Sequence, residues 1–303
     1  MQNIDLNKIA SMDAHHLKLW ALECETRFEK QFTDAYDLIE REKVKILYLS
    51  GPSCSGKTTS TKKLEEALER MKKNVVTVST DDFFLDTDLA PRNRDGTPNY
   101  ESFDFIDSKM LIDVVRRIIS CEDYLMPRFD FKTKERVLPE KPERAPENTV
   151  VIVEGIHALN DKLIAPFSDV CTAGMYICPE DPIKLNSRML LESTEIRFLR
   201  RLVRDKRHRA TDAPQTFAMW ENVIEGEDLY ISPFLKNADI FINSTFLYEP
   251  FIMRNQALPL LKAIGDDSIY RFKAQSLCER LERLFPLGEE LISDTSLLNE
   301  FLR

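Results

Sequence analysis

Residues 44–59 read V-K-I-L-Y-L-S-G-P-S-C-S-G-K-T-T, and this stretch decides the fold class. Its first six residues are a short apolar run of the kind that forms a buried parallel strand. Gly51 to Thr58 then match G-x-x-x-x-G-K-[ST], in which glycines let successive N–H groups point inward as a nest for anions. The start of the following helix adds the positive end of its dipole. The stretch therefore predicts a site for the phosphates of a nucleoside triphosphate.

The pattern also assigns roles within this phosphate loop. The side chain of Lys57 reaches the β- and γ-phosphates, and the hydroxyl of Thr58 is offered to Mg²⁺. The predicted nucleotide-binding residues of the loop are Gly51, Pro52, Ser53, Cys54, Ser55, Gly56, Lys57, Thr58 and Thr59.

Apolar runs and helical periodicity organise the rest of the chain. Further buried strands are predicted at 75–79, 149–153, 173–178 and 239–242, and helices at 1–43, 57–72, 107–121, about 180–228, 248–264 and 268–284. Strands that alternate with helices predict an α/β fold, a parallel sheet of about five strands of the P-loop NTPase type with helices on both faces. Helical extensions would flank it at both ends, so the predicted division is 1–43, 44–265 and 266–303.

Composition excludes several classes of protein. The 303 residues carry 42 basic and 51 acidic side chains, so a net charge of −9 argues against a general nucleic-acid binder. No apolar run approaches the ~20 residues of a membrane span, and Asp5 and Asp13 interrupt any signal-peptide pattern. The 6 cysteines form no C-x-x-C pair, which indicates free thiols and a reducing, cytoplasmic compartment. Only 8 glycines occur, and three of them (51, 56 and 155) fall at the predicted site.

Two carboxylates follow predicted strands directly. Asp81 lies in S-T-D-D-F-F at 79–84, and Glu154 follows the apolar run that ends at residue 153. Ligands of parallel sheets bind at the carboxyl ends of the strands, so both side chains are expected to face the phosphates. There Asp81 could accept a proton from an acceptor hydroxyl and approach the metal, while Glu154 would lie on the metal side. The alternatives are a helix or turn cap for Asp81 and a turn acid for Glu154.

A basic run, R-F-L-R-R-L-V-R-D-K-R-H-R, occupies residues 197–209. Arg197, Arg200 or Arg201, and Arg204 would share one helical face. Guanidinium groups on one face suit a triphosphate, since each can bind oxygens in a bidentate fork. The alternatives are a solvated basic face and, less in keeping with the net charge, a nucleic-acid contact.

Taken in order, these motifs resemble the uridine kinase and phosphoribulokinase family of P-loop kinases, and most closely its uridine kinase-like branch. The matching pieces lie at 51–59, 79–84, 126–136, 150–159 and 200–209, within about residues 44–265. The resemblance implies an ATP- and Mg²⁺-dependent kinase that acts on a small-molecule acceptor, with residues 44–265 as its kinase domain.

The resemblance also implies site residues. It assigns catalysis to Asp81 as general base with Lys57 and Arg204, and the metal to Thr58, Asp81 and Glu154. Arg201, Arg204 and Arg209 match the lid that closes over the phosphates, so Arg204 and Arg209 join the nucleotide-binding set. The substrate-binding residues implied are Asp81, Phe84, Glu101, Phe129, Lys134 and Arg201.

The acceptor end departs from the family pattern. Pyrimidine kinases of the family typically show Pro-x-Tyr-Asp-Phe followed by a histidine. Here Phe129 replaces the tyrosine, Lys134 stands near the histidine's place, and Met219 replaces a glutamine expected further along. The expected reaction is γ-phosphoryl transfer from ATP to the 5′-OH of a nucleoside. The alternatives are a sugar phosphate or other small polyol as acceptor, and a nucleotide-sensing regulatory protein without kinase activity. No nucleic acid or membrane partner is expected, and the terminal helices could form contacts of a homo-oligomer.

Overall fold

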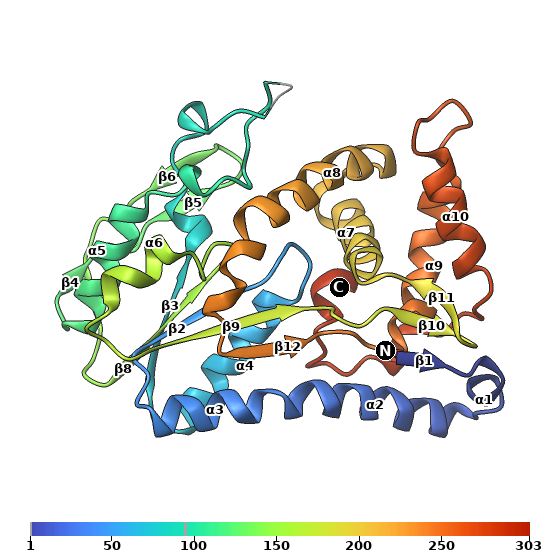
Figure 1. Cartoon of the computed structure of the whole chain (residues 1–303), viewed down its shortest axis with the longest axis horizontal. Helices are drawn as coiled ribbons and strands as arrows, with labels where there is room; N and C mark the ends of the chain where they lie inside the picture. Colours follow the sequence, from blue (N-terminus) through green and yellow to red (C-terminus); the bar gives the residue numbers. More distant parts are fainter. Residues whose placement is uncertain (1, 94–95) are drawn as a thin grey trace.

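The computed structural model describes residues 2–93 and 96–303, and a five-stranded parallel sheet lies at its centre (Figure 1). The strands stand in the order β12-β9-β2-β8-β3, and every neighbouring pair is parallel. Their bounds are β2 Ile46–Ser50, β3 Asn74–Ser79, β8 Thr149–Glu154, β9 Thr172–Cys178 and β12 Ile240–Asn243. The α/β fold predicted from the phosphate loop is thus confirmed.

Alternation along the central strand builds two hydrophobic cores. Leu47 and Leu49 point into one cluster, whereas Ile46 and Tyr48 point into the other, because successive side chains of a strand face opposite sides. Helices cover both faces (Figure 1). Their bounds are α1 Leu6–Ala10, α2 Ala14–Lys30, α3 Phe32–Arg41, α4 Lys57–Arg70, α5 Ser108–Ile119, α6 Asp161–Ile164, α7 Ser193–Arg209, α8 Ala213–Tyr230, α9 Glu249–Lys262, α10 Arg271–Leu281 and α11 Asn299–Leu302.

A second small sheet corrects two sequence-based expectations. Residues 1–43 and about 180–228 were each expected to be helical, but β1 Gln2–Ile4 pairs in parallel with β10 Ile183–Leu185, which pairs in turn with β11 Arg188–Leu191. Asn186 and Ser187 connect β10 to β11, and both have positive φ, 48° and 67°. Two such residues form the hairpin turn that matches the twist of the flanking strands. The helical pattern therefore begins only with α7, whose first turn carries a capping box made by Glu192 and Glu195.

Short elements lie between these helices and strands. They are the strands β4 Asp123–Tyr124, β5 Arg128–Asp130, β6 Glu135–Val137 and β7 Glu143–Arg144, and the 3₁₀ turns η1 Thr80–Phe83, η2 Thr87–Leu89, η3 Phe103–Phe105, η4 Ala165–Phe167, η5 Ser232–Asn237 and η6 Glu289–Leu291. β5 and β6 form an antiparallel hairpin on the side of the sheet that carries β3 and α5 (Figure 1).

The terminal extensions share a core with the sheet. Phe28 and Phe32 are 2% and 0% exposed, and the ring of Phe28 lies 5.3 Å from those of Phe32 and Phe246. Four residues near the C-terminus, Leu297, Leu298, Phe301 and Leu302, belong to the same cluster. Across the described residues, none of the helices combines the length and apolarity that a membrane crossing requires.

This shared core predicts that the N-terminal helices stabilise the whole chain. Replacing Phe32 with alanine should lower the free energy of unfolding by about 3–5 kcal/mol, since a large ring is removed from a buried site. The matched control is Phe272→Ala, whose ring is 80% exposed; its effect should stay within about 0.5 kcal/mol. Urea unfolding followed by circular dichroism measures both. Equal effects of the two substitutions would show that α3 does not pack on the core.

Candidate functional site

The phosphate loop leaves the end of β2 and turns into α4. Gly56 precedes the helix with φ +100°, a conformation in the left-handed region that favours glycine. The Nζ of Lys57 donates to the carbonyl oxygens of Gly51 at 2.7 Å and Pro52 at 3.1 Å. The loop is therefore closed on its own lysine, while Thr58 is exposed at the start of α4.

The two predicted carboxylates meet beside this loop. Glu154, at the end of β8, pairs in register with Leu49 of β2 and Ser79 of β3. The hydroxyl of Ser79 donates to Glu154 Oε1 at 2.6 Å. The next residue, Gly155, has φ +149°, and a Cβ there would lie 1.8 Å from Thr80 Oγ1. Glycine at 155 thus lets the start of η1 approach β8, which brings Asp81 next to Glu154.

The carboxylates of this site act on one another electrostatically. Burial and the nearby charge of Glu154 raise the pKa of Asp81 to about 6, against the attraction of Lys57. Burial also raises the pKa of Glu101 to about 7, with Arg201 opposing and Asp81 reinforcing the shift. Carboxylates whose pKa values move toward neutrality are well suited to exchange protons with a substrate hydroxyl.

A fully buried carboxylate organises the predicted lid arginines. Asp205 of α7 is 0% exposed and lies 3.2 Å from Arg201, 3.1 Å from Arg204 and 3.7 Å from Arg209. Arg201 also donates to Ser53 Oγ of the phosphate loop at 3.2 Å. The three lid arginines are thus brought together at the loop. Asp205 is a residue that sequence reasoning missed, although its spacing, four residues from both Arg201 and Arg209, was the available signal.

Two further arginines of the basic run form ion pairs away from solvent. Arg197 donates to Glu227 at 2.5 Å. Arg200 binds Glu249 of α9 through two hydrogen bonds of 2.6 and 2.7 Å, and both of these side chains are at most 2% exposed. Arg197 and Arg200 thus have carboxylate partners, because charged groups this deep in the protein need fixed partners. Whether either also meets the phosphates stays a prediction.

Arg200 also binds the backbone of the phosphate loop on its buried side. Its guanidinium donates to the carbonyl oxygen of Cys54 at 3.3 Å and to that of Ser244 at 2.7 Å. The hydroxyl of Ser244 then donates to the carbonyl oxygen of Ser55 at 2.7 Å. Glu249 and Ser244 help to hold the loop, and sequence reasoning missed both. No local sequence pattern marks a contact between residues more than 40 positions apart.

Aromatic rings cluster beyond Asp81, on the predicted acceptor side. Phe84 stacks on Phe105 with centroids 4.6 Å apart and meets Phe129 edge-on at 5.6 Å. Phe84 and Phe129 are 4% and 6% exposed, so the structure brings these two predicted substrate residues together within a buried cluster. Lys134 instead lies on the exposed turn between β5 and β6, with φ 63°. The roles of these three residues in binding stay predictions.

The donor set of the predicted metal site consists of oxygen atoms. Thr58 supplies a hydroxyl, and Asp81 and Glu154 supply carboxylates whose mutual repulsion a cation would relieve. Mg²⁺ prefers such donors and usually takes one or two carboxylates together with phosphate oxygens and water. Throughout the described part of the chain, histidine, cysteine and carboxylate side chains form no group of three or more placed to hold a metal. The residues therefore fit a magnesium ion that arrives with a nucleotide.

Comparison with known proteins identifies the family. The model of the "Phosphoribulokinase / Uridine kinase family" matches residues 46–246. The chain belongs to this family. Its members are kinases, which transfer a phosphoryl group to a hydroxyl acceptor, and the matched region contains the phosphate loop, both carboxylates and the lid arginines.

Individual relatives are distant. The uridine kinase of Anoxybacillus flavithermus is 25% identical over 203 residues, which cover 67% of this chain and 87% of that protein. The uridine kinase of Staphylococcus aureus (strain Newman) is 26% identical over 201 residues, covering 65% and 86%. A solved structure titled as a possible uridine kinase from Bacillus stearothermophilus covers 66% of this chain and 88% of its own, at 16% identity and a TM-score of 0.44.

The buried pair beneath the phosphate loop yields a prediction about stability. Glu249→Gln should lower the free energy of unfolding by about 3–5 kcal/mol, because it leaves the Arg200 charge buried without its partner. Glu282→Gln is the matched control: its carboxylate pairs with Lys262 and is 46% exposed, so its effect should stay below about 1 kcal/mol. Chemical unfolding in urea measures both. A loss below 1 kcal/mol for Glu249→Gln would contradict the structural role assigned to the pair.

Proposed function

We propose that this chain is an ATP-dependent kinase that transfers the γ-phosphoryl group to the 5′-OH of a nucleoside. The observation that carries the proposal is the position of Asp81, a carboxylate with a pKa near neutrality between the phosphate-loop lysine and Glu154. Phosphoryl transfer needs positioned charge and a group that orients or deprotonates the acceptor. The names of the relatives, uridine kinases, favour a nucleoside over other acceptors.

In the proposed reaction, the predicted residues divide the work. The N–H groups of the loop and Lys57 bind the phosphates, and Asp81 accepts the proton of the acceptor hydroxyl as its oxygen attacks the γ-phosphorus. The bond from that phosphorus to the bridging oxygen breaks, and ADP leaves. Thr58, Asp81 and Glu154 would hold Mg²⁺, which when bound neutralises charge on the phosphates. Arg201, Arg204 and Arg209 supply positive charge from the lid.

The sugar-binding part of the acceptor site is assigned to Glu101. Its carboxylate interacts electrostatically with both Asp81 and Arg201, which supports a role beside the reacting hydroxyl. α8 packs directly on it, since a Cβ at Gly226 would lie 2.6 Å from Glu101 Cβ. A carboxylate there suits the paired hydroxyls of a ribose.

Because all six cysteines are free, a reducing cytoplasmic location stays part of the proposal.

Acceptor-dependent ADP formation tests the reaction. Uridine, cytidine, other nucleosides and a set of phosphorylated sugars are compared in a coupled assay with ATP and Mg²⁺. A nucleoside should give the largest stimulation, and Asp81→Asn should reduce that rate by at least ~10²-fold, the usual contribution of a general base. Asp88→Asn, an exposed residue of η2, serves as the matched control and should keep the rate.

Stimulation by phosphorylated sugars alone would replace the nucleoside with a sugar-type acceptor. ADP formation that no acceptor changes would overturn the kinase assignment in favour of a nucleotide-dependent regulator. Circular dichroism of Asp81→Asn verifies that the loss of activity does not come from unfolding.

The raised pKa of Asp81 predicts the pH dependence of the reaction. Asp81 acts as a base only when ionised, so kcat/KM for the acceptor should fall about tenfold per pH unit on the acid side of the profile and level off above it. Bound Mg²⁺ would relieve the repulsion by Glu154, so this limb should lie below the pKa of about 6 that Asp81 has in the metal-free site. Glu154→Gln removes the neighbouring negative charge that raises this pKa. The falling limb of that variant should therefore move to lower pH, whatever its absolute rate. A limb that moves to higher pH in Glu154→Gln would contradict the assignment.

A further inference from the structure

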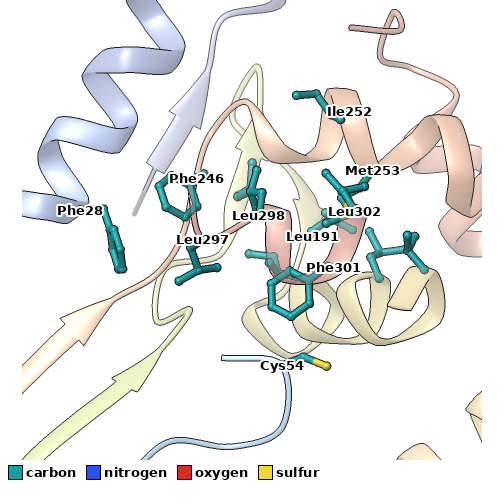
Figure 2. Packing of buried hydrophobic residues seen from close by; sticks show 14 of the residues in the cluster. Phe28, Cys54, Leu191, Phe246, Ile252, Met253, Leu297, Leu298, Phe301 and Leu302 are labelled. Carbon is teal, nitrogen blue, oxygen red and sulfur yellow. The ribbon is translucent and has the colours of Figure 1, made fainter. Parts of the chain in front are cut away.

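The end of the chain lies against the phosphate loop. The four apolar residues of the terminal segment, residues 296–303, are all 0% exposed: Leu297, Leu298, Phe301 and Leu302. Figure 2 shows them packed between Cys54 of the loop and the side chains of α9 and β11. The contact is close, because a Cβ on Gly56 would lie 2.1 Å from Leu297 Cδ1. The space beside the loop is thus filled by the protein itself.

One side chain of this segment binds the start of α4. Glu300 Oε2 accepts hydrogen bonds from the backbone N–H of Thr59 at 3.3 Å and from its hydroxyl at 3.1 Å. Thr59 lies in the first turn of α4, where backbone N–H groups have no partner within the helix. In a phosphate loop such groups cradle the α- and β-phosphates of the nucleotide. A carboxylate of the chain therefore occupies an anion position of the predicted nucleotide site.

Glu300 also faces the lid. Its charge acts on Arg200 and Arg204 of α7, the helix that carries the lid arginines. The carboxylate thus lies within the positive field that loop and lid create together, where the polyphosphate of a nucleotide would bind. Two anions in this field repel each other and share one set of donors.

The terminal segment is fixed by the core. Ser296 Oγ donates to Glu25 of α2 at 2.5 Å, and that carboxylate is 6% exposed. The guanidinium of Arg200 stacks over the ring of Phe301 at 5.2 Å. Contacts on both sides of Glu300 therefore set its position, so its meeting with Thr59 does not depend on a loose chain end.

We propose that Glu300 is an internal competitor of the nucleotide and thereby sets its affinity. Its carboxylate takes the Thr59 N–H while the site holds no nucleotide, and the polyphosphate of a nucleoside di- or triphosphate displaces it on binding. The inference rests on the nucleotide binding of the proposed function and adds to it a residue outside the matched family region, which ends at 246.

Calorimetric titration with ADP tests the proposal on the full chain. Glu300→Gln removes the charge, and Glu300→Ala removes both charge and hydrogen bonds. Each should lower Kd for ADP at least threefold, and inorganic pyrophosphate should show a gain of the same direction, because the competition is for a phosphate position. Glu290→Gln, the same substitution at an exposed residue of the C-terminal extension, should leave Kd unchanged.

Thermal unfolding of each variant separates competition from a purely structural role. If Glu300 only caps α4, both variants lose stability and bind ADP no more tightly than the wild type, which overturns the proposal and leaves nucleotide binding intact. A gain for ADP without one for pyrophosphate also overturns it. Absence of ADP binding by the wild type and by both variants overturns the proposed function as well. Binding by the variants alone supports the competition in its strongest form.

Discussion

The buried ion pair between Arg200 and Glu249 is the constraint on which the rest of the site depends. Removing two charges from water is costly, and the cost is offset only when geometry is good and the remaining donors are used. Here the guanidinium satisfies its other donors with carbonyl oxygens of Cys54 and Ser244. This network therefore joins four parts of the fold at one point: α7, α9, the end of β12 and the phosphate loop. If any of them moved far, a charge would be left in the core without its partner.

The cations that a nucleotide would meet already have oxygen partners. Lys57 donates to two carbonyls of its own loop, and Asp205 lies among the three lid arginines. Such pairing keeps like charges close together in the absence of a substrate, since each positive group is neutralised locally. A bound polyphosphate would then replace carbonyl and carboxylate oxygens with phosphate oxygens, and the site would need little rearrangement to accept it.

Local pattern explains what could be predicted from the sequence. Runs of neighbouring residues mark the loop at 51–58 and the strands that end before Asp81 and at Glu154. The sheet and the position of these groups could therefore be predicted. Pairing between segments far apart in the sequence could not be predicted. β1 pairs with β10 about 180 residues later, and the only local signal for the hairpin was the pair of turn residues Asn186 and Ser187. The partner of Arg200 could not be predicted for the same reason, because Glu249 lies on another helix.

Residues outside the region matched by the family model contribute to the phosphate loop of this chain. The match covers residues 46–246, yet Glu249 completes the ion pair under the loop, and Leu297 and Glu300 contact the loop itself. Glu25 of α2 binds Ser296, so the N-terminal helices help to place that contact. A domain cut at the matched boundaries would leave Arg200 without its carboxylate and Gly56 without its neighbour. The phosphate loop of this protein is therefore shaped by segments from both ends of the chain, through packing that the pattern of residues 51–58 alone does not encode.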